Sequence, residues 1–218
     1  MALRFIALAF LIGCVSIPHV PPKIRTYKDQ AETTVTVKLW CDKFSEGMYG
    51  DLQAGSGVIV DERHVITAWH VVKCPGFSTL PIIQVGLQDG RAFMMVIDKV
   101  DGDADLALLT IFSADRFHLK VPPPVIGKAE AGDSACSSVG FPKKGWHCGE
   151  IASVSDSKKG NIEVDAETVS GNSGSALYNS SGQLVGIIVQ RQSCPGEKTQ
   201  DCIGYATSLK GRFKFYPK

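Results

Sequence analysis

The feature that most constrains the fold is a series of short apolar segments between residues 33 and 208. The first of them, 34–40, alternates polar and apolar residues with a period of two, which is typical of a β-strand with one buried face. Turn residues separate the segments, and the pair Asp89–Gly90 is a hairpin signal. Only Trp69–Val72 fits a helical turn, and no long amphipathic pattern occurs, so the chain predicts an all-β fold.

A proline-rich stretch at 113–127 divides these segments into two sets. Its three consecutive prolines cannot occupy a central strand, because proline has no amide hydrogen to donate. The first set lies at 34–40, 55–61, 64–68, 82–88, 92–98 and 105–111, and the second at 134–141, 148–155, 161–166, 174–179, 183–190 and 202–208. The two sets predict two six-stranded antiparallel barrels, at about 33–115 and 125–210, with a cleft between them.

Composition narrows the classes of function. The chain has 218 residues, a net charge of +1 and no basic cluster, so no nucleic-acid partner is expected. Hydrophobic residues make up 44% of the sequence, which is enough for a sizeable buried core. We therefore expect one globular unit at 33–210, followed by a short tail at 211–218.

The N-terminal segment has the pattern of an export signal. Arg4 precedes an apolar run at 5–13, which is shorter than the roughly 20 residues that a membrane-spanning helix needs. The run ends in Leu-Ile-Gly-Cys, which resembles a bacterial lipobox with Cys14 as the lipidated residue. An ordinary cleaved signal and an uncleaved anchor fit the same residues. We expect a signal at 1–14, a tether at 15–32, and a periplasmic, envelope-attached or secreted protein.

The cysteines support export. Seven are present, and setting Cys14 aside leaves an even number, as expected for disulfides in an oxidising compartment. Pairing each cysteine with its neighbour predicts the bonds Cys41–Cys74, Cys136–Cys148 and Cys194–Cys202. Free buried thiols are the alternative. No metal site is expected, because no Cys-x-x-Cys pair occurs.

A segment rich in glycine and serine, 170–177, carries a candidate nucleophile. Ser173 lies between Asn172 and Gly174, and Gly171 lies two residues before it. Small residues allow the backbone to bend so that the amides of Gly171 and Ser173 converge, which predicts an oxyanion hole. A plain turn between two strands is the structural alternative.

Two residues earlier in the chain supply what a serine nucleophile needs. His70 follows the segment 64–68, where it can face the cleft, and an imidazole takes up and returns a proton near neutral pH. Asp105 begins an apolar segment, so its carboxylate can be partly buried and orient that imidazole. We interpret Asp101 and Asp103 as solvated turn residues. The remaining histidines are interpreted as structural: His19, His64, His118 and His147.

These residues occur in the order His, Asp, Ser, as in chymotrypsin. The sequences around them, at 67–72, 105–109 and 171–177, together resemble trypsin-like peptidases of the bacterial HtrA/Deg kind. The likeness extends to 164–187 and 203–209, and Gly-Asn-Ser-Gly is also similar to glutamyl endopeptidases. The resemblance implies a two-barrel fold with the active site in the cleft, no cofactor and no metal. The catalytic triad that it implies is His70, Asp105 and Ser173.

The chain departs from the family that it resembles in two places. Asn172 stands where digestive proteases have the aspartate that receives a new N-terminal amine, so that activation route is not expected. The tail at 211–218 is too short for a PDZ domain. We therefore do not extend the oligomeric behaviour of HtrA proteins to this chain, and we expect a monomer.

The specificity pocket is expected beside the nucleophile. Glu167 lies six residues before Ser173, at the place of the aspartate that selects basic side chains in trypsin. It predicts a preference for Lys or Arg, unless it points to solvent, and Arg191 would instead attract acidic side chains. The pocket residues suggested by these positions are Glu167, Thr168, Val189, Gln190 and Arg191.

The sequence thus predicts a serine endopeptidase that acts on a peptide or protein through an acyl-enzyme intermediate. A catalytically silent lipoprotein that binds a peptide or partner on the same fold is the alternative, and the intact triad residues argue against it. An esterase or a phage- or virus-encoded processing peptidase would share the triad and differ in substrate.

Overall fold

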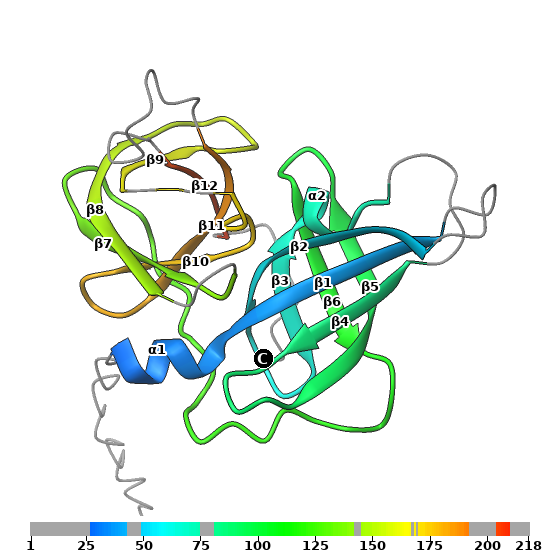
Figure 1. The fold of residues 1–218 in the computed structure, drawn as a ribbon. Coiled ribbons are helices and arrows are strands. Elements are labelled where there is room, and N and C mark those ends of the chain that lie inside the picture. Colours follow the sequence, from blue (N-terminus) through cyan, green and yellow to red (C-terminus); the bar gives the residue numbers. More distant parts are fainter. Residues whose placement is uncertain are drawn as a thin grey trace, which may run out of the picture.

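The computed structural model describes residues 27–42, 49–74, 81–141, 145–166, 168, 170–191 and 204–209. Two closed antiparallel barrels of six strands each make up almost all of this part, which confirms the predicted fold class (Figure 1). The predicted signal with Cys14, the tether as far as residue 26 and the tail at 211–218 lie outside the described residues. Within the described residues, no helix has both the length and the hydropathy to cross a membrane.

The first barrel has the strand order β1-β2-β3-β6-β5-β4, and β4 pairs with β1 to close it. Its strands are β1 (Thr34–Asp42), β2 (Tyr49–Ile59), β3 (His64–Ala68), β4 (Ile82–Gly86), β5 (Ala92–Asp101) and β6 (Leu106–Ile111). A one-turn helix, α2 (Trp69–Val72), follows β3 directly. Each apolar segment predicted as a strand before the proline-rich stretch overlaps one of these strands.

The second barrel has the strand order β10-β11-β12-β9-β8-β7. Its strands are β7 (Ser134–Val139), β8 (Gly145–Val154), β9 (Ile162–Asp165), β10 (Ala176–Asn179), β11 (Leu184–Arg191) and β12 (Gly204–Ser208). The connector between the barrels contains no named strand and is anchored by the buried Phe117 and by a bridge from Ile126 to Leu184. The proline-rich stretch therefore lies between the two barrels.

The core follows from strand alternation. Val35, Val37 and Leu39 of β1 point inward and are at most 1% exposed, whereas Lys38 between them is partly exposed. The apolar cluster of the first barrel continues into the second through Tyr178. The two barrels consequently share a continuous apolar contact, which fixes how their loops meet.

A short helix before the first strand also contacts the second barrel. This helix, α1 (Tyr27–Thr33), includes the last residues of the segment predicted as a tether. Gln30 is buried, and the Thr33 hydroxyl lies 3.2 Å from the Tyr178 hydroxyl. The part of the predicted tether at 27–32 is therefore helical, because it packs against the rest of the molecule.

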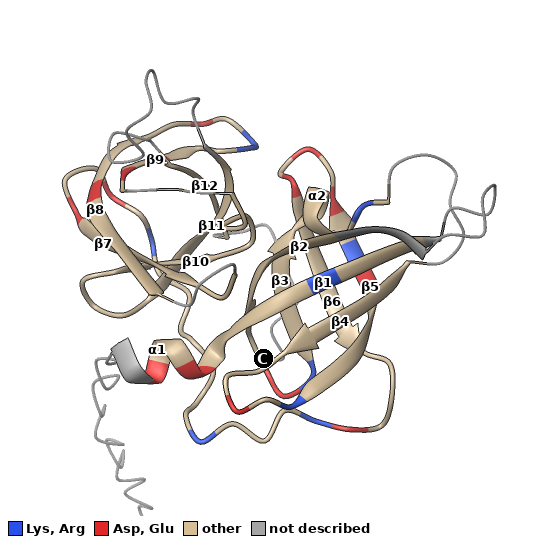
Figure 2. Ribbon diagram, viewed as in Figure 1, with Lys and Arg blue, Asp and Glu red and all other residues tan. Residues whose placement is uncertain are grey.

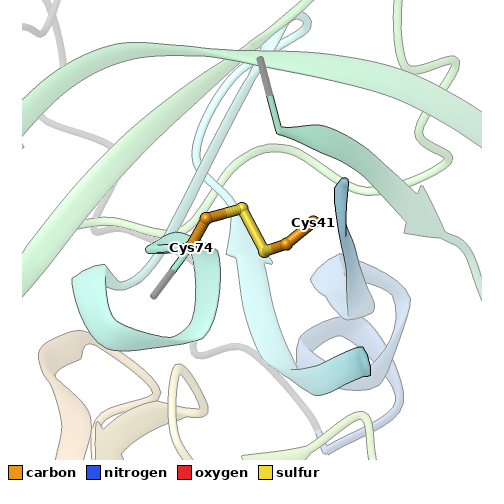
Figure 3. Close-up of a disulfide and its surroundings, with 2 residues drawn as sticks. All are labelled: Cys41 and Cys74. Carbon is orange, nitrogen blue, oxygen red and sulfur yellow. A yellow bond between two sulfur atoms is a disulfide. The ribbon is translucent and has the colours of Figure 1, made fainter. Parts of the chain in front are cut away.

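Two of the three predicted disulfides are present. Cys41 of β1 is bonded to Cys74, which follows α2 (Figure 3). Cys136 of β7 is bonded to Cys148, its direct cross-strand partner on β8. The predicted pair Cys194–Cys202 lies outside the described residues.

Candidate active site

The helix α2 holds His70 against Asp105. The Trp69 amide donates to the Asp105 carbonyl at 2.9 Å, and the His70 amide donates to Asp105 Oδ1 at 3.0 Å. The imidazole Nδ1 of His70 lies 2.8 Å from Asp105 Oδ2. The histidine side chain is 46% exposed and the aspartate side chain 6% exposed. A buried carboxylate thus orients an imidazole that remains accessible from solvent.

A tight turn at 101–105, named here the acid turn, places the carboxylate. Asp105 has a φ of 56°, a left-handed conformation that aspartate tolerates better than most residues. The Ala104 amide donates to Asp101 Oδ1 at 3.0 Å, and the Asp105 amide donates to the Gly102 carbonyl at 3.3 Å. Asp101 was interpreted from the sequence as a solvated turn residue. In the structure its carboxylate also stabilises the turn through the hydrogen bond from Ala104.

A lysine from the second barrel reaches the same carboxylate. Lys159 lies in the loop at 155–161 between β8 and β9, named here the lysine loop, and its Nζ is 3.0 Å from Asp105 Oδ2. Burial raises the pKa of Asp105, but the hydrogen bonds from His70 and Lys159 outweigh it and hold that pKa below its usual range. Lys159 was not among the residues expected at the site, because nothing near it in the sequence indicates this contact.

Ser173 lies in a turn before β10, and the first barrel holds its backbone. Its carbonyl accepts a hydrogen bond from the Ser56 amide of β2 at 2.8 Å. A Cβ added at Gly55 would lie 2.8 Å from the Ser173 carbonyl oxygen and 2.9 Å from the Val71 side chain. Ser173 and the residue after His70 therefore both pack against Gly55. Among the described residues no hydrogen bond joins His70 to Ser173.

The hydroxyl of Ser56 connects three segments at this point. It donates to the Gly171 carbonyl at 3.2 Å and accepts from the amides of Gly140 and Phe141 at 3.0 and 3.1 Å. Together with its amide bond to Ser173, these contacts fix the turn at 170–175 from the side of the first barrel.

The expected oxyanion donors lie in this turn. Gly171 has a φ of 95°, which the absence of a side chain permits. No backbone carbonyl in the described part of the chain accepts a hydrogen bond from the amide of Gly171 or of Ser173. Both amides are therefore free of backbone partners there, as oxyanion donors would have to be.

The structure describes only part of the expected pocket. Thr168 and Val189 are both 2% exposed, and Val189 belongs to the apolar core. Gln190 is exposed. Glu167 and the side chain of Arg191 lie outside the described residues, so the two predicted charge preferences stay predictions.

His64 and the possible metal ligands are the other residues on which the sequence bears. The Nδ1 of His64 lies 2.8 Å from both carboxylate oxygens of Asp61, in the turn between β2 and β3. This pair ties the turn together and agrees with a structural histidine. In the described ranges, no three His, Cys, Asp or Glu side chains gather as they would around a metal ion.

Comparison with known proteins agrees with this geometry. The model of the trypsin-like peptidase domain matches residues 55–187. Serine endoprotease DegS of Escherichia coli (strain K12) is 32% identical over 176 residues, which cover 75% of this chain and 47% of DegS. Serine protease HTRA4 of Homo sapiens is 27% identical over 172 residues, which cover 72% of this chain and 34% of HTRA4.

Periplasmic serine endoprotease DegP of Escherichia coli (strain K12) is 30% identical over 147 residues, which cover 61% of this chain and 29% of DegP. The matched region thus spans less than half the length of each of these relatives. The domain match covers most of both barrels, from within β2 to within β11, and includes His70, Asp105 and Ser173. The chain therefore belongs to the family of trypsin-like peptidase domains, with relatives of the HtrA/Deg kind.

Proposed function

We propose that this chain is a serine endopeptidase with Ser173 as nucleophile, His70 as general base and Asp105 as the residue that orients the base. The observation that carries the proposal is the 2.8 Å contact between the accessible imidazole of His70 and the buried carboxylate of Asp105. The family match supports it, because the matched region contains all three residues.

In this mechanism the Ser173 hydroxyl oxygen attacks the carbonyl carbon of the scissile peptide bond. His70 Nε2 takes the hydroxyl proton, and Asp105 stabilises the imidazolium that forms. The imidazolium then gives its proton to the leaving amine, the C–N bond breaks, and an acyl-enzyme remains. Water, deprotonated by His70, hydrolyses the ester and restores Ser173.

The negative charge on the carbonyl oxygen needs donors while the tetrahedral intermediate exists. The amides of Gly171 and Ser173 are proposed for this role. Their support is the left-handed conformation of Gly171 and the absence of backbone acceptors for either amide in the described residues. Such donors contribute on the order of 10²–10³ in rate per hydrogen bond in comparable hydrolases.

We further infer that the substrate is a peptide or protein and that the enzyme acts outside the cytoplasm. The name of DegP places that relative in the periplasm, and the two disulfides of this chain fit an oxidising compartment. Lipid attachment through Cys14 and a monomeric state remain predictions.

The test is the variant Ser173→Ala, compared with Ser137→Ala. Ser137 is a buried serine of β7 whose hydroxyl has no hydrogen-bond partner in the described structure, so its loss should be tolerated. We expect kcat/KM for an unbiased peptide mixture to fall by about 10⁴-fold or more in Ser173→Ala, and labelling by a fluorophosphonate to disappear. The control should keep both.

Unchanged turnover in folded Ser173→Ala would rule out the assignment. If folded wild-type protein neither labels nor cleaves, the chain is a binding protein on the same fold, which is the alternative that the sequence left open.

A further inference from the structure

Lys159 makes a contact that the proposed mechanism does not use. Its Nζ lies 3.0 Å from Asp105 Oδ2, the same oxygen that contacts His70 Nδ1 at 2.8 Å. Two nitrogens that share one oxygen at these distances are within about 6 Å of each other. The lysine and the histidine come from different barrels, so this carboxylate joins both halves of the molecule.

The lysine loop is held in place by further contacts with the acid turn. Thr207 of β12 accepts a hydrogen bond from the Gly160 amide at 2.9 Å and donates to the Ala104 carbonyl at 3.0 Å. Lys158 Nζ lies 2.7 Å from Asp103 Oδ2. Figure 2 shows the blue of this loop, between β8 and β9, opposite the red of the turn that follows β5. The position of Lys159 is thus fixed by its neighbours on both sides.

We propose that Lys159 is a positioning residue of the active site, whose ammonium group fixes the Asp105 carboxylate and opposes protonation of the His70 imidazole. The proposal rests on the proposed function for its catalytic meaning. The ammonium group contacts the same carboxylate oxygen as the imidazole. The negative charge of Asp105 is therefore shared between the two groups instead of stabilising the imidazolium only. It also places a positive charge near the ring, which disfavours a second positive charge there.

The direction of the effect follows from these charges. Loss of the Lys159 charge makes the imidazolium more favourable, so the histidine holds its proton to a higher pH. Asp105 remains ionised at the pH values where a histidine titrates, because its pKa is held below the usual carboxyl range. Lys159 is 44% exposed, so solvent screens the interaction and limits its size.

Other charged groups lie on the elements that carry His70, Asp105 and Lys159 or beside them. Lys73 follows α2, and the acid turn carries Asp101 and Asp103. The lysine loop carries Asp156 and Lys158. Asp103 and Lys158 form an exposed ion pair of their own, so Lys158 offers a matched control that removes a positive charge from the same loop.

The first experiment measures kcat/KM against pH, from about pH 5 to about pH 9, for a peptide that the enzyme cleaves. In Lys159→Met we expect the acid limb to move upward by about half a pH unit to one unit. Lys159→Arg, which keeps the charge, should retain the wild-type limb, and so should Lys158→Met. An acid limb that does not move in Lys159→Met contradicts the proposal.

The second experiment does not need activity. The imidazole of His70 is titrated by NMR in Ser173→Ala and in Ser173→Ala/Lys159→Met, with the signal assigned by its loss in a His70 variant. We expect the same upward movement of the midpoint in the second protein. An unchanged midpoint overturns the role of Lys159 whether or not the chain cleaves peptides, and a lower melting temperature alongside it marks the lysine as purely structural.

The two experiments separate the two proposals. If the NMR midpoint of His70 moves but the wild-type protein shows no hydrolysis, the proposed function is overturned and the role of Lys159 beside His70 stands. Hydrolysis that depends on Ser173 with an unmoved midpoint overturns only the positioning role. If Lys159→Met does not fold, Lys159→Gln, which keeps a polar head, is titrated in its place against the same prediction.

Discussion

At the scale of single residues, Gly174 limits the shape of the turn around Ser173. It has a φ of 87°, and a Cβ there would lie 1.9 Å from the Ser56 carbonyl oxygen and 2.4 Å from Thr67 Oγ1. The turn can therefore approach β2 this closely only with glycine at this position.

We predict that Gly174→Ala is destabilised by about 2–4 kcal/mol and loses most of its fluorophosphonate labelling, because the turn must move away from β2. Urea unfolding and labelling measure the two effects. Gly86→Ala is the control, since a Cβ at Gly86 meets no atom within 4 Å, and it should change both by little. Equal effects at the two glycines would show that the close approach is not what matters.

Some candidate site residues could be named from the sequence for a physical reason. The chemistry of amide hydrolysis restricts the residue types at His70, Asp105 and Ser173, and their order is that of the chymotrypsin fold. Small residues beside the serine mark the turn. Lys159 has no such signal. Its contact with Asp105 depends on how two separately closed barrels dock, and 54 residues separate the two in the chain. Asp101 was misjudged because its role depends on the conformation of the acid turn.

At the scale of elements, the bond Cys41–Cys74 ties β1 to the end of the helix that carries His70. It closes a longer stretch of chain than Cys136–Cys148, with separations of 33 and 12 residues. In the chain-entropy model, the bond that closes the shorter loop contributes about 3 kcal/mol and the bond that closes the longer loop about 4 kcal/mol.

We predict that replacing both Cys41 and Cys74 by serine lowers the melting temperature and also lowers kcat/KM, because α2 loses its covalent attachment. The matched double variant at Cys136 and Cys148 should lower the melting temperature with little effect on kcat/KM, since that bond joins two strands already paired in the sheet. Scanning calorimetry and peptide hydrolysis give both readouts. Equal losses of activity would argue against a link between the first bond and His70.

Element type was more predictable than element length. All twelve apolar segments overlap strands. The strand β2 starts at Tyr49, earlier than its apolar run, because it continues to pair with β1 as far as Asp42. The helix α1 was not predicted, since a helix of 7 residues is unstable alone and this one depends on the contact between Thr33 and Tyr178.

At the scale of the whole molecule, the barrels meet through buried polar contacts as well as through the apolar core. Thr207 is fully buried and bridges Ala104 of the first barrel and Gly160 of the second. We predict that Thr207→Val lowers the free energy of unfolding by about 1–3 kcal/mol, because the Ala104 carbonyl and the Gly160 amide lose their partner.

Chemical denaturation checks this prediction, with Thr110→Val as control. Thr110 lies on β6, and its hydroxyl makes no hydrogen bond among the described residues. The control should unfold like the wild type. If Thr207→Val also unfolds at the wild-type denaturant concentration, the hydrogen bonds of Thr207 between the barrels contribute nothing to stability.

Ser56 lies in the first barrel but supports the turn that carries Ser173 in the second, so the order in which the two barrels fold matters. A polypeptide in which only the N-terminal half has folded possesses the proposed base His70 and its partner Asp105 but lacks the proposed nucleophile Ser173. One in which only the C-terminal half has folded lacks the β2 groups that brace residues 171 and 173. In the proposed mechanism, a newly made molecule can therefore begin hydrolysis only after its two halves have come together.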